Sequence, residues 1–250
     1  MPDFYGWRKT IGVATSSINT CIQPEFDMMR PMGVSNQIAR MHIPPKKMKS
    51  DKDFAHNMDV HMESLGPAID NLMTLKPDHL IMTISSMAVW GGSSSTADDL
   101  KNSVIKRAGQ DIGVTMPSDG LTSALKAYGA KKIAIIDPYY PVIQPSLETF
   151  FGEFGFEVVR FHHMRGEQLT ELARVSSGFM IDAVRAVDGD DIDAIVQFGA
   201  NWPMAAIADE SERWLGKPFV ATNIATYWHA LRSLGITDKI DGHSRLMREF

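Results

Sequence analysis

The chain has 250 residues, of which 44% are hydrophobic and 22% charged, and its formal net charge is −5. This composition is typical of a folded globular protein, and the length allows one large domain or two small ones. The acidic balance and the lack of a basic block argue against nucleic acid or an anionic membrane surface as a partner.

The cysteine content and the length of the apolar runs indicate the cellular compartment of the protein. A single cysteine, Cys21, excludes an internal disulfide framework and a cysteine-based zinc cluster, so we expect no metal site of that kind and a reducing compartment. The opening residues do not resemble a signal peptide, and no apolar run approaches the roughly 18–20 residues that span a bilayer. The expectation is a cytoplasmic protein.

Strand and helix patterns alternate along the chain. Short apolar runs predict strands over residues 10–14, 36–43, 79–83, 132–136, 156–161, 194–198 and 219–221. Helical spacing and capping residues predict helices from about residue 24 and over 54–75, 97–108, 118–128, 142–154, 167–187, 203–215 and 222–234, with Ser118 or Asp119 as one cap. Such alternation favours parallel sheets covered on both faces.

The scheme restarts near residue 116, which predicts two α/β halves of similar plan. We assign residues 1–115 plus 229–250 to the first half and 116–228 to the second. No low-complexity linker separates them, so the halves should share a face with a ligand cleft between them.

One stretch, Leu80–Gly92, stands out because its apolar run ends in two hydroxyl residues, Ser85 and Ser86. Ligands of open α/β sheets bind beyond the carboxyl ends of the strands, and hydroxyls at such a turn suit a carboxylate or an oxyanion. The alternative is a serine-rich loop without a ligand.

Several motifs then resemble one known family. Ile11–Glu25 is similar to the opening "IGV-x-x-P-S-S-N-T-x-x-E-P-E" of maleate cis–trans isomerases and arylmalonate decarboxylases, a branch of the aspartate/glutamate racemase superfamily. Ile84–Ala88 resembles the branch's "C/G-T-S-x-S" loop, and Asp137–Tyr139 its "T-P-Y" turn. Thr222–Arg232 and Gly242–Leu246 resemble its closing helix and tail.

The resemblance implies two flavodoxin-like parallel-sheet halves related by a pseudo-twofold, an active site in the cleft between them, and no cofactor. It also implies a cysteine in each half's loop, at the position of Ile84 and near Gly199. This sequence has neither, since its only thiol is Cys21. Two-base racemisation and thiolate addition to a double bond both need such groups, so we expect neither as the main mechanism.

The residues that remain suit the stabilisation of negative charge. The resemblance places Ser85, Ser86 and Tyr139 in an oxyanion-type pocket, closed by backbone N–H groups near Gly199 and Ala200, where donors would stabilise a developing enolate. Residues expected to hold the substrate are Asn19, Ile84, Gly199, Ala200 and Asn201. The proton donor is open, with Cys21 and Tyr139 as candidates.

We therefore predict a cofactor-independent enzyme, a decarboxylase or other lyase, that acts on a small carboxylic or dicarboxylic acid through an enolate. One alternative is an isomerase, maleate-isomerase-like or racemase-like, with a non-standard acid/base. Another is a non-catalytic carboxylate-binding protein on the same scaffold. The sequence leaves the substrate's identity and the oligomeric state open, a homo-oligomer included.

Overall fold

The computed structural model describes residues 3–44, 46–47 and 50–250. Two four-stranded parallel sheets carry the fold. The first sheet consists, in spatial order, of β2 (Val34–Met41), β1 (Lys9–Ser16), β3 (His79–Met82) and β4 (Gly113–Thr115). The second consists of β6 (Glu157–His163), β5 (Lys132–Asp137), β7 (Ala194–Gln197) and β8 (Phe219–Ala221). The predicted fold class is confirmed, and the two sheets share one strand order.

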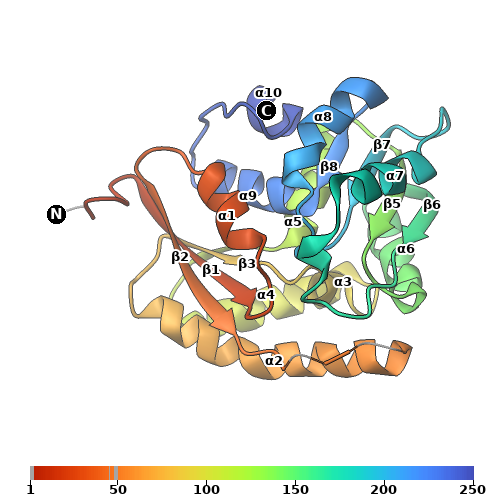
Figure 1. Cartoon of the computed structure of the whole chain (residues 1–250). Helices are drawn as coiled ribbons and strands as arrows, with labels where there is room; N and C mark the ends of the chain where they lie inside the picture. The colour runs from red at the N-terminus through yellow and green to blue at the C-terminus, as the bar shows by residue number, and fades with distance from the viewer. Residues whose placement is uncertain (1–2, 45, 48–49) are drawn as a thin grey trace.

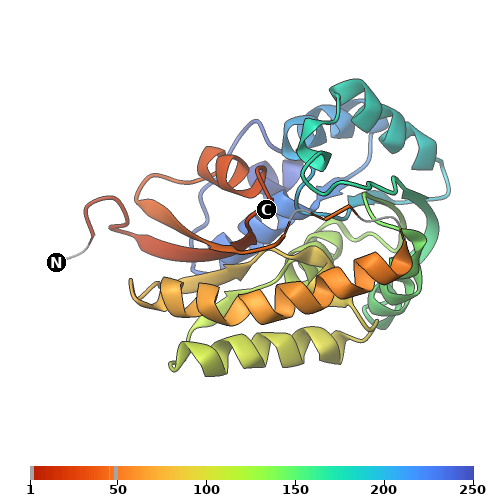
Figure 2. The same ribbon diagram turned by 60° about the horizontal axis from the view of Figure 1, so that its bottom comes forward.

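Helices connect the strands and cover the sheets (Figure 1). They are α1 (Ile22–Met28), α2 (Asp51–Met73), α3 (Ser85–Val89), α4 (Ser94–Ala108), α5 (Pro117–Tyr128), α6 (Gln144–Glu153), α7 (Ser177–Val187), α8 (Ala205–Leu215), α9 (Thr222–Ser233) and α10 (Arg245–Glu249). Figure 2 shows α2 and α4 side by side on the underside of the molecule. No helix in the described ranges is both long and apolar enough to cross a membrane.

The two halves are joined through α5 and α9, which follow the last strand of the first and second sheet respectively. These two helices pack against each other, and α5 also contacts β8 while α9 contacts β3 and β4. Gly120 allows their close approach, because a Cβ there would lie 2.6 Å from backbone atoms of Ala225 and Thr226. The division of the chain at residues 115/116 and 228/229 stays a prediction.

Some local expectations were wrong. The helix predicted over 167–187 begins only at Ser177, because the Ser176 hydroxyl caps α7 by accepting the N–H of Phe179. Residues 167–176 instead form a loop with one 3-10 turn, Leu172–Arg174. Neither Ser118 nor Asp119 is the N-cap of α5; Met116 holds that position, and the Asp119 carboxylate accepts its N–H at 2.8 Å.

Three short elements of the structure were not predicted from the hydrophobic pattern of the sequence. Ser85–Val89 was expected to be a loop and forms α3, while β4 and α10 were not expected at all. Elements of three to five residues are too short for a hydrophobic period to reveal.

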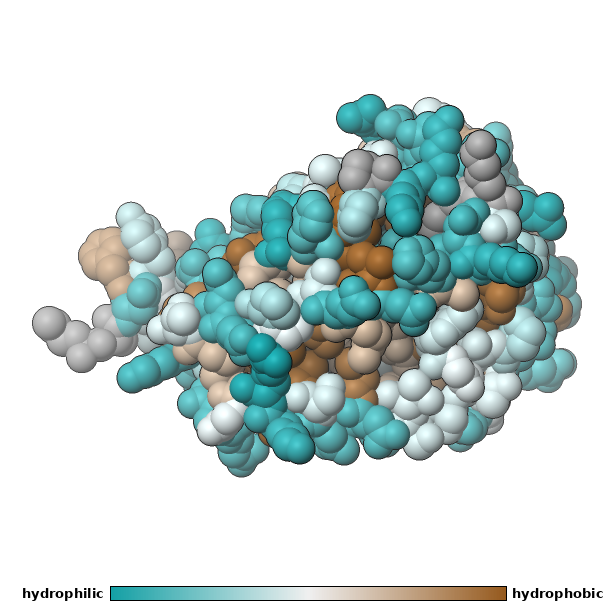
Figure 3. All heavy atoms as spheres, turned by 90° about the horizontal axis from the view of Figure 1, so that it is seen from below, coloured by the Kyte–Doolittle hydropathy of each residue, from teal (hydrophilic) through white to brown (hydrophobic). Residues whose placement is uncertain are grey.

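The underside of the molecule carries apolar side chains on a mainly hydrophilic face (Figure 3). A shallow groove between α2, α3 and α4 is lined by Met58, Met62, Met87 and Trp90 among others.

Candidate functional site

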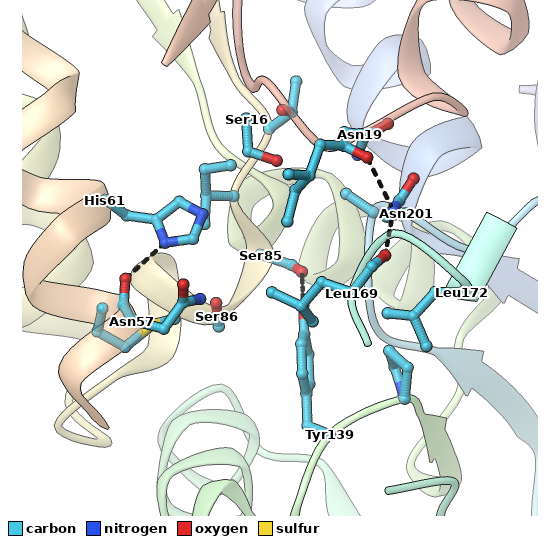
Figure 4. A pocket seen from close by; sticks show the side chains of 16 residues that line it. Ser16, Asn19, Asn57, His61, Ser85, Ser86, Tyr139, Leu169, Leu172 and Asn201 are labelled. Atoms are coloured by element: carbon cyan, nitrogen blue, oxygen red, sulfur yellow. Dashed lines mark hydrogen bonds between the residues drawn. The ribbon is translucent and has the colours of Figure 1, made fainter. Parts of the chain in front are cut away.

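A pocket lies where five loops converge, one after each of β1, β3, β5, β6 and β7. It therefore takes residues from both sheets and lies at the carboxyl ends of their strands, the usual ligand position in α/β folds. The lining residues are Ser16, Ile18, Asn19, Asn57, Met58, His61, Thr83, Ile84, Ser85, Ser86, Pro138, Tyr139, Leu169, Leu172, Ala200 and Asn201 (Figure 4).

Tyr139 is presented to the pocket by a tight turn at the end of β5. The buried Asp137 carboxylate accepts the N–H of Tyr139 at 2.9 Å and a hydrogen bond from Nδ1 of His163 at 2.8 Å. The Tyr139 ring packs edge-on against Phe54 and Phe198, with centroids 5.3 and 6.0 Å away. Backbone and ring are thus both held, and the phenol is fixed in direction.

The hydroxyl groups of Ser85, Ser86 and Tyr139 lie together in this pocket. Ser85 Oγ lies 3.1 Å from Tyr139 Oη, and either group can be the donor. Burial raises the pKa of Tyr139 to about 12, and hydrogen bonds with Ser85 and Ser86 only partly oppose the increase. The phenol is therefore protonated at neutral pH and can donate to a negatively charged oxygen.

The two asparagines of the pocket also stabilise its loops. Asn19 Oδ1 accepts the N–H groups of Cys21 and Ile22, both at 2.9 Å, at the start of α1. Asn201, from the second half, accepts the N–H of Thr20 at 3.0 Å and donates to the carbonyl of Leu169 at 2.7 Å. It therefore ties the loop after β7 to the loop after β1. Ile84 and Ala200 line the pocket as expected.

Gly199 does not line the pocket, contrary to the expectation. Its N–H donates to Thr222 Oγ1 at 3.2 Å, so this group is not free for a substrate oxygen. Gly199 has φ +136°, and a Cβ would lie 2.7 Å from Pro138 Cδ. The residue shapes the loop that carries Ala200 and Asn201.

Cys21 is also outside the lining. Its side chain is buried, and that burial, with the nearby Glu25 carboxylate as a second cause, raises the pKa of the thiol to about 12. Such a thiol is not a thiolate at neutral pH. Its catalytic role stays a prediction, and the placement does not favour it.

Polar pocket residues that the sequence analysis did not predict include Asn57 and His61, which come from α2. His61 Nδ1 lies 2.7 Å from the carbonyl oxygen of Asn57. A carbonyl only accepts, so Nδ1 carries the hydrogen. A signal was available, because His61 lies on the buried stripe of the helix between Met58 and Leu65, where an apolar residue is expected.

The pocket is nearly free of formal charge. Of the side chains that line it, only those of His61 and Tyr139 can gain or lose a proton. None of the lining residues is Asp, Glu, Lys, Arg or Cys. Burial lowers the pKa of His61, so its ring is neutral at neutral pH. Within the described ranges no group of three His, Cys, Asp or Glu side chains could hold a metal ion.

Comparisons with known proteins identify relatives for this architecture. A model of the arylmalonate decarboxylase family matches residues 77–247. A maleate isomerase from Alcaligenes faecalis is 20% identical over 250 residues, covering 95% of both chains. An arylmalonate decarboxylase from Bordetella bronchiseptica is 27% identical over 150 residues, which is 58% of this chain and 62% of the relative.

Solved structures show the same fold. The maleate cis–trans isomerase of Nocardia farcinica, solved as a mutant with a covalently bound succinylcysteine intermediate, superposes with a TM-score of 0.86 at 19% identity, covering 97% of this chain and 99% of that one. A liganded mutant of arylmalonate decarboxylase has a TM-score of 0.80 at 19% identity, with 95% and 98% covered.

Proposed function

Because the chain belongs to the arylmalonate decarboxylase family, we propose that it is an enzyme that decarboxylates a small carboxylic or dicarboxylic acid through an enolate. The observation that supports this most is the meeting of Ser85, Ser86 and Tyr139 in one pocket between the two sheets. Their hydroxyls are buried, and the one formed by Tyr139 stays protonated at neutral pH.

Loss of CO₂ leaves an electron pair on the α-carbon, and the charge spreads onto the oxygens of the remaining carboxylate. Hydroxyl donors that already point at those oxygens stabilise this charge more than they stabilise the substrate. Apolar side chains form much of the remaining wall, namely Ile18, Met58, Ile84, Leu169 and Leu172. A charged carboxylate against such a wall is poorly solvated, and its conversion into neutral CO₂ is favoured.

We propose that the reaction uses neither a cofactor nor the pair of thiols that the family resemblance implies. The single cysteine, Cys21, is buried outside the pocket lining with a raised thiol pKa. Hydroxyl donors and an apolar wall suit the loss of CO₂, whereas a covalent adduct of the kind seen in the Nocardia isomerase requires a reactive thiolate.

An isomerase is the second candidate. It is favoured by the maleate isomerase from Alcaligenes faecalis, which matches along 95% of both chains, whereas the Bordetella decarboxylase matches 58% of this chain. In a double-bond shift, a base would remove an α-proton, the same hydroxyls would stabilise the resulting enolate, and the base would deliver the proton to another carbon. A carboxylate-binding protein without turnover is a third candidate on this scaffold.

The test is a screen of small mono- and dicarboxylic acids, phenylmalonate and maleate among them, by thermal shift and then by CO₂ release and proton NMR. A decarboxylase releases CO₂ from a hit, an isomerase converts maleate without releasing CO₂, and a binding protein returns the ligand unchanged. With a consumed substrate, Ser86→Ala and Tyr139→Phe should each lower turnover by about tenfold or more while the thermal midpoint stays near that of the wild type. Unchanged turnover in both variants would remove these hydroxyls from the mechanism.

A further inference from the structure

The pocket holds one side chain that can exchange a proton near neutral pH, and it does not come from any of the five strand-end loops. It is His61, on the α2 helix that runs past the pocket. Figure 4 shows His61 and Asn57 entering the pocket from one side, with Asn201 and Leu169 on the opposite side.

The tautomer of His61 follows from its hydrogen bond to a backbone carbonyl. Nδ1 carries the hydrogen and donates it to the carbonyl of Asn57 at 2.7 Å, one helical turn earlier. In the neutral ring the lone pair is therefore on Nε2. That edge of the ring is turned towards the interior of the pocket (Figure 4). The helix thus fixes both the orientation of the imidazole and the nitrogen that is available to a ligand.

We infer that His61 is a catalytic residue, the group that carries the proton to the carbanion through Nε2. This inference rests on the proposed decarboxylation. As the bond between the α-carbon and the departing carboxylate breaks, its electron pair stays on the α-carbon and CO₂ leaves. The Nε2 proton of the imidazolium then moves to the α-carbon, and His61 returns to its neutral form and takes its next proton from water.

The surroundings of His61 explain when the ring becomes charged. Burial lowers the pKa of the free ring, and Tyr139 is the only other titratable side chain in the lining. A bound carboxylate would be the nearest negative charge, and such a charge favours the imidazolium. We therefore expect binding of a dicarboxylate to bring a proton with it. The imidazolium would then be the only cation facing the substrate among the described lining residues.

Two substitutions separate proton transfer from structure. In His61→Asn the side-chain amide nitrogen can take the place of Nδ1 and keep the bond to the Asn57 carbonyl, but Nε2 is lost. In His61→Gln the amide nitrogen comes near the place of Nε2 but cannot take up a proton. His56→Asn is the matched control, because His56 is exposed on the same helix and does not line this pocket.

The experiment measures proton uptake, turnover and product stereochemistry. Calorimetric titration with phenylsuccinate, a dicarboxylate whose two carboxylates are on different carbons so that it cannot lose CO₂ through an enolate, is done at pH 7.5 in two buffers of different ionisation enthalpy. It should show uptake of about one proton by the wild type and by His56→Asn. Both His61 variants should bind without this uptake. In both His61 variants, CO₂ release from phenylmalonate should fall by about 10²-fold. The residual product that they form from α-methyl-α-phenylmalonate should become racemic, because water then protonates the carbanion from either face.

A structural role for His61 predicts different results. If His61→Asn matches the wild type in proton uptake, turnover and enantiomeric excess, the inference is wrong while the proposed decarboxylation stands. If the wild type itself neither binds nor consumes any acid of the screen, the proposed function is wrong and the inference falls with it.

Discussion

Replacing Glu25 by Gln tests how the buried charge next to the site affects stability. Glu25 lies on α1 and is buried; Oε2 accepts a hydrogen bond from Asn223 Nδ2 at 2.5 Å, and Oε1 accepts the N–H of Ala205 at 3.3 Å. The same Asn223 nitrogen donates to the carbonyl of Ala200, which lines the pocket. Burial raises the pKa of Glu25 from 4.5 to about 7, and the two hydrogen bonds only partly oppose this.

The sign of the pH dependence follows from the raised pKa. The folded protein binds the Glu25 proton more tightly than the unfolded chain does, so the stability that this proton provides is complete below pH 4.5 and is lost as the pH rises through about 7. The shift corresponds to about 3 kcal/mol between these limits. In Glu25→Gln this contribution is absent at every pH, and the amide can still pair with Asn223 if the asparagine side chain turns.

Urea denaturation of both proteins at pH 5, 6, 7 and 8 measures this effect. Relative to the wild type, Glu25→Gln should gain about 2.5 kcal/mol in free energy of unfolding between pH 5 and pH 8. Other titrating groups are common to both proteins and cancel in the difference. Two parallel pH curves would refute the reasoning and would mean that the carboxyl of Glu25 titrates alike in the folded and unfolded chain.

Two further substitutions test the loops around the site. Gly199→Ala should cost about 1–3 kcal/mol in free energy of unfolding, because φ +136° and the 2.7 Å approach of Pro138 Cδ both disfavour a Cβ; urea denaturation showing no loss would contradict this. Cys21→Ala should leave turnover of a substrate found in the screen within about twofold of the wild type, because the thiol lies outside the pocket lining. Loss of activity in Cys21→Ala together with an active Ser85→Ala would instead favour an isomerase in which Cys21 is the non-standard acid/base.

Much of the fold could be predicted because each strand and long helix carries its own local pattern. The apolar run Ile133–Ile136 predicts a buried strand without reference to the rest of the chain, and the structure has β5 there. Strand ends indicate where a pocket forms, and the family resemblance implies which of them meet. Together they allowed Ser85, Tyr139 and Asn201 to be proposed as pocket residues although 54 and 62 positions separate successive members. Their roles in a reaction stay predictions.

The remainder depended on how distant elements pack. No local pattern shows that the Gly199 N–H is used by Thr222, 23 positions later, or that Cys21 is buried beside the pocket and not in it. The position of His61 on the apolar stripe of α2 indicates a buried histidine, but only the passage of α2 beside the strand ends makes it a pocket residue. Hydrophobic periodicity reports which face of an element is buried; which groups share that buried space is decided by the packing of the whole chain.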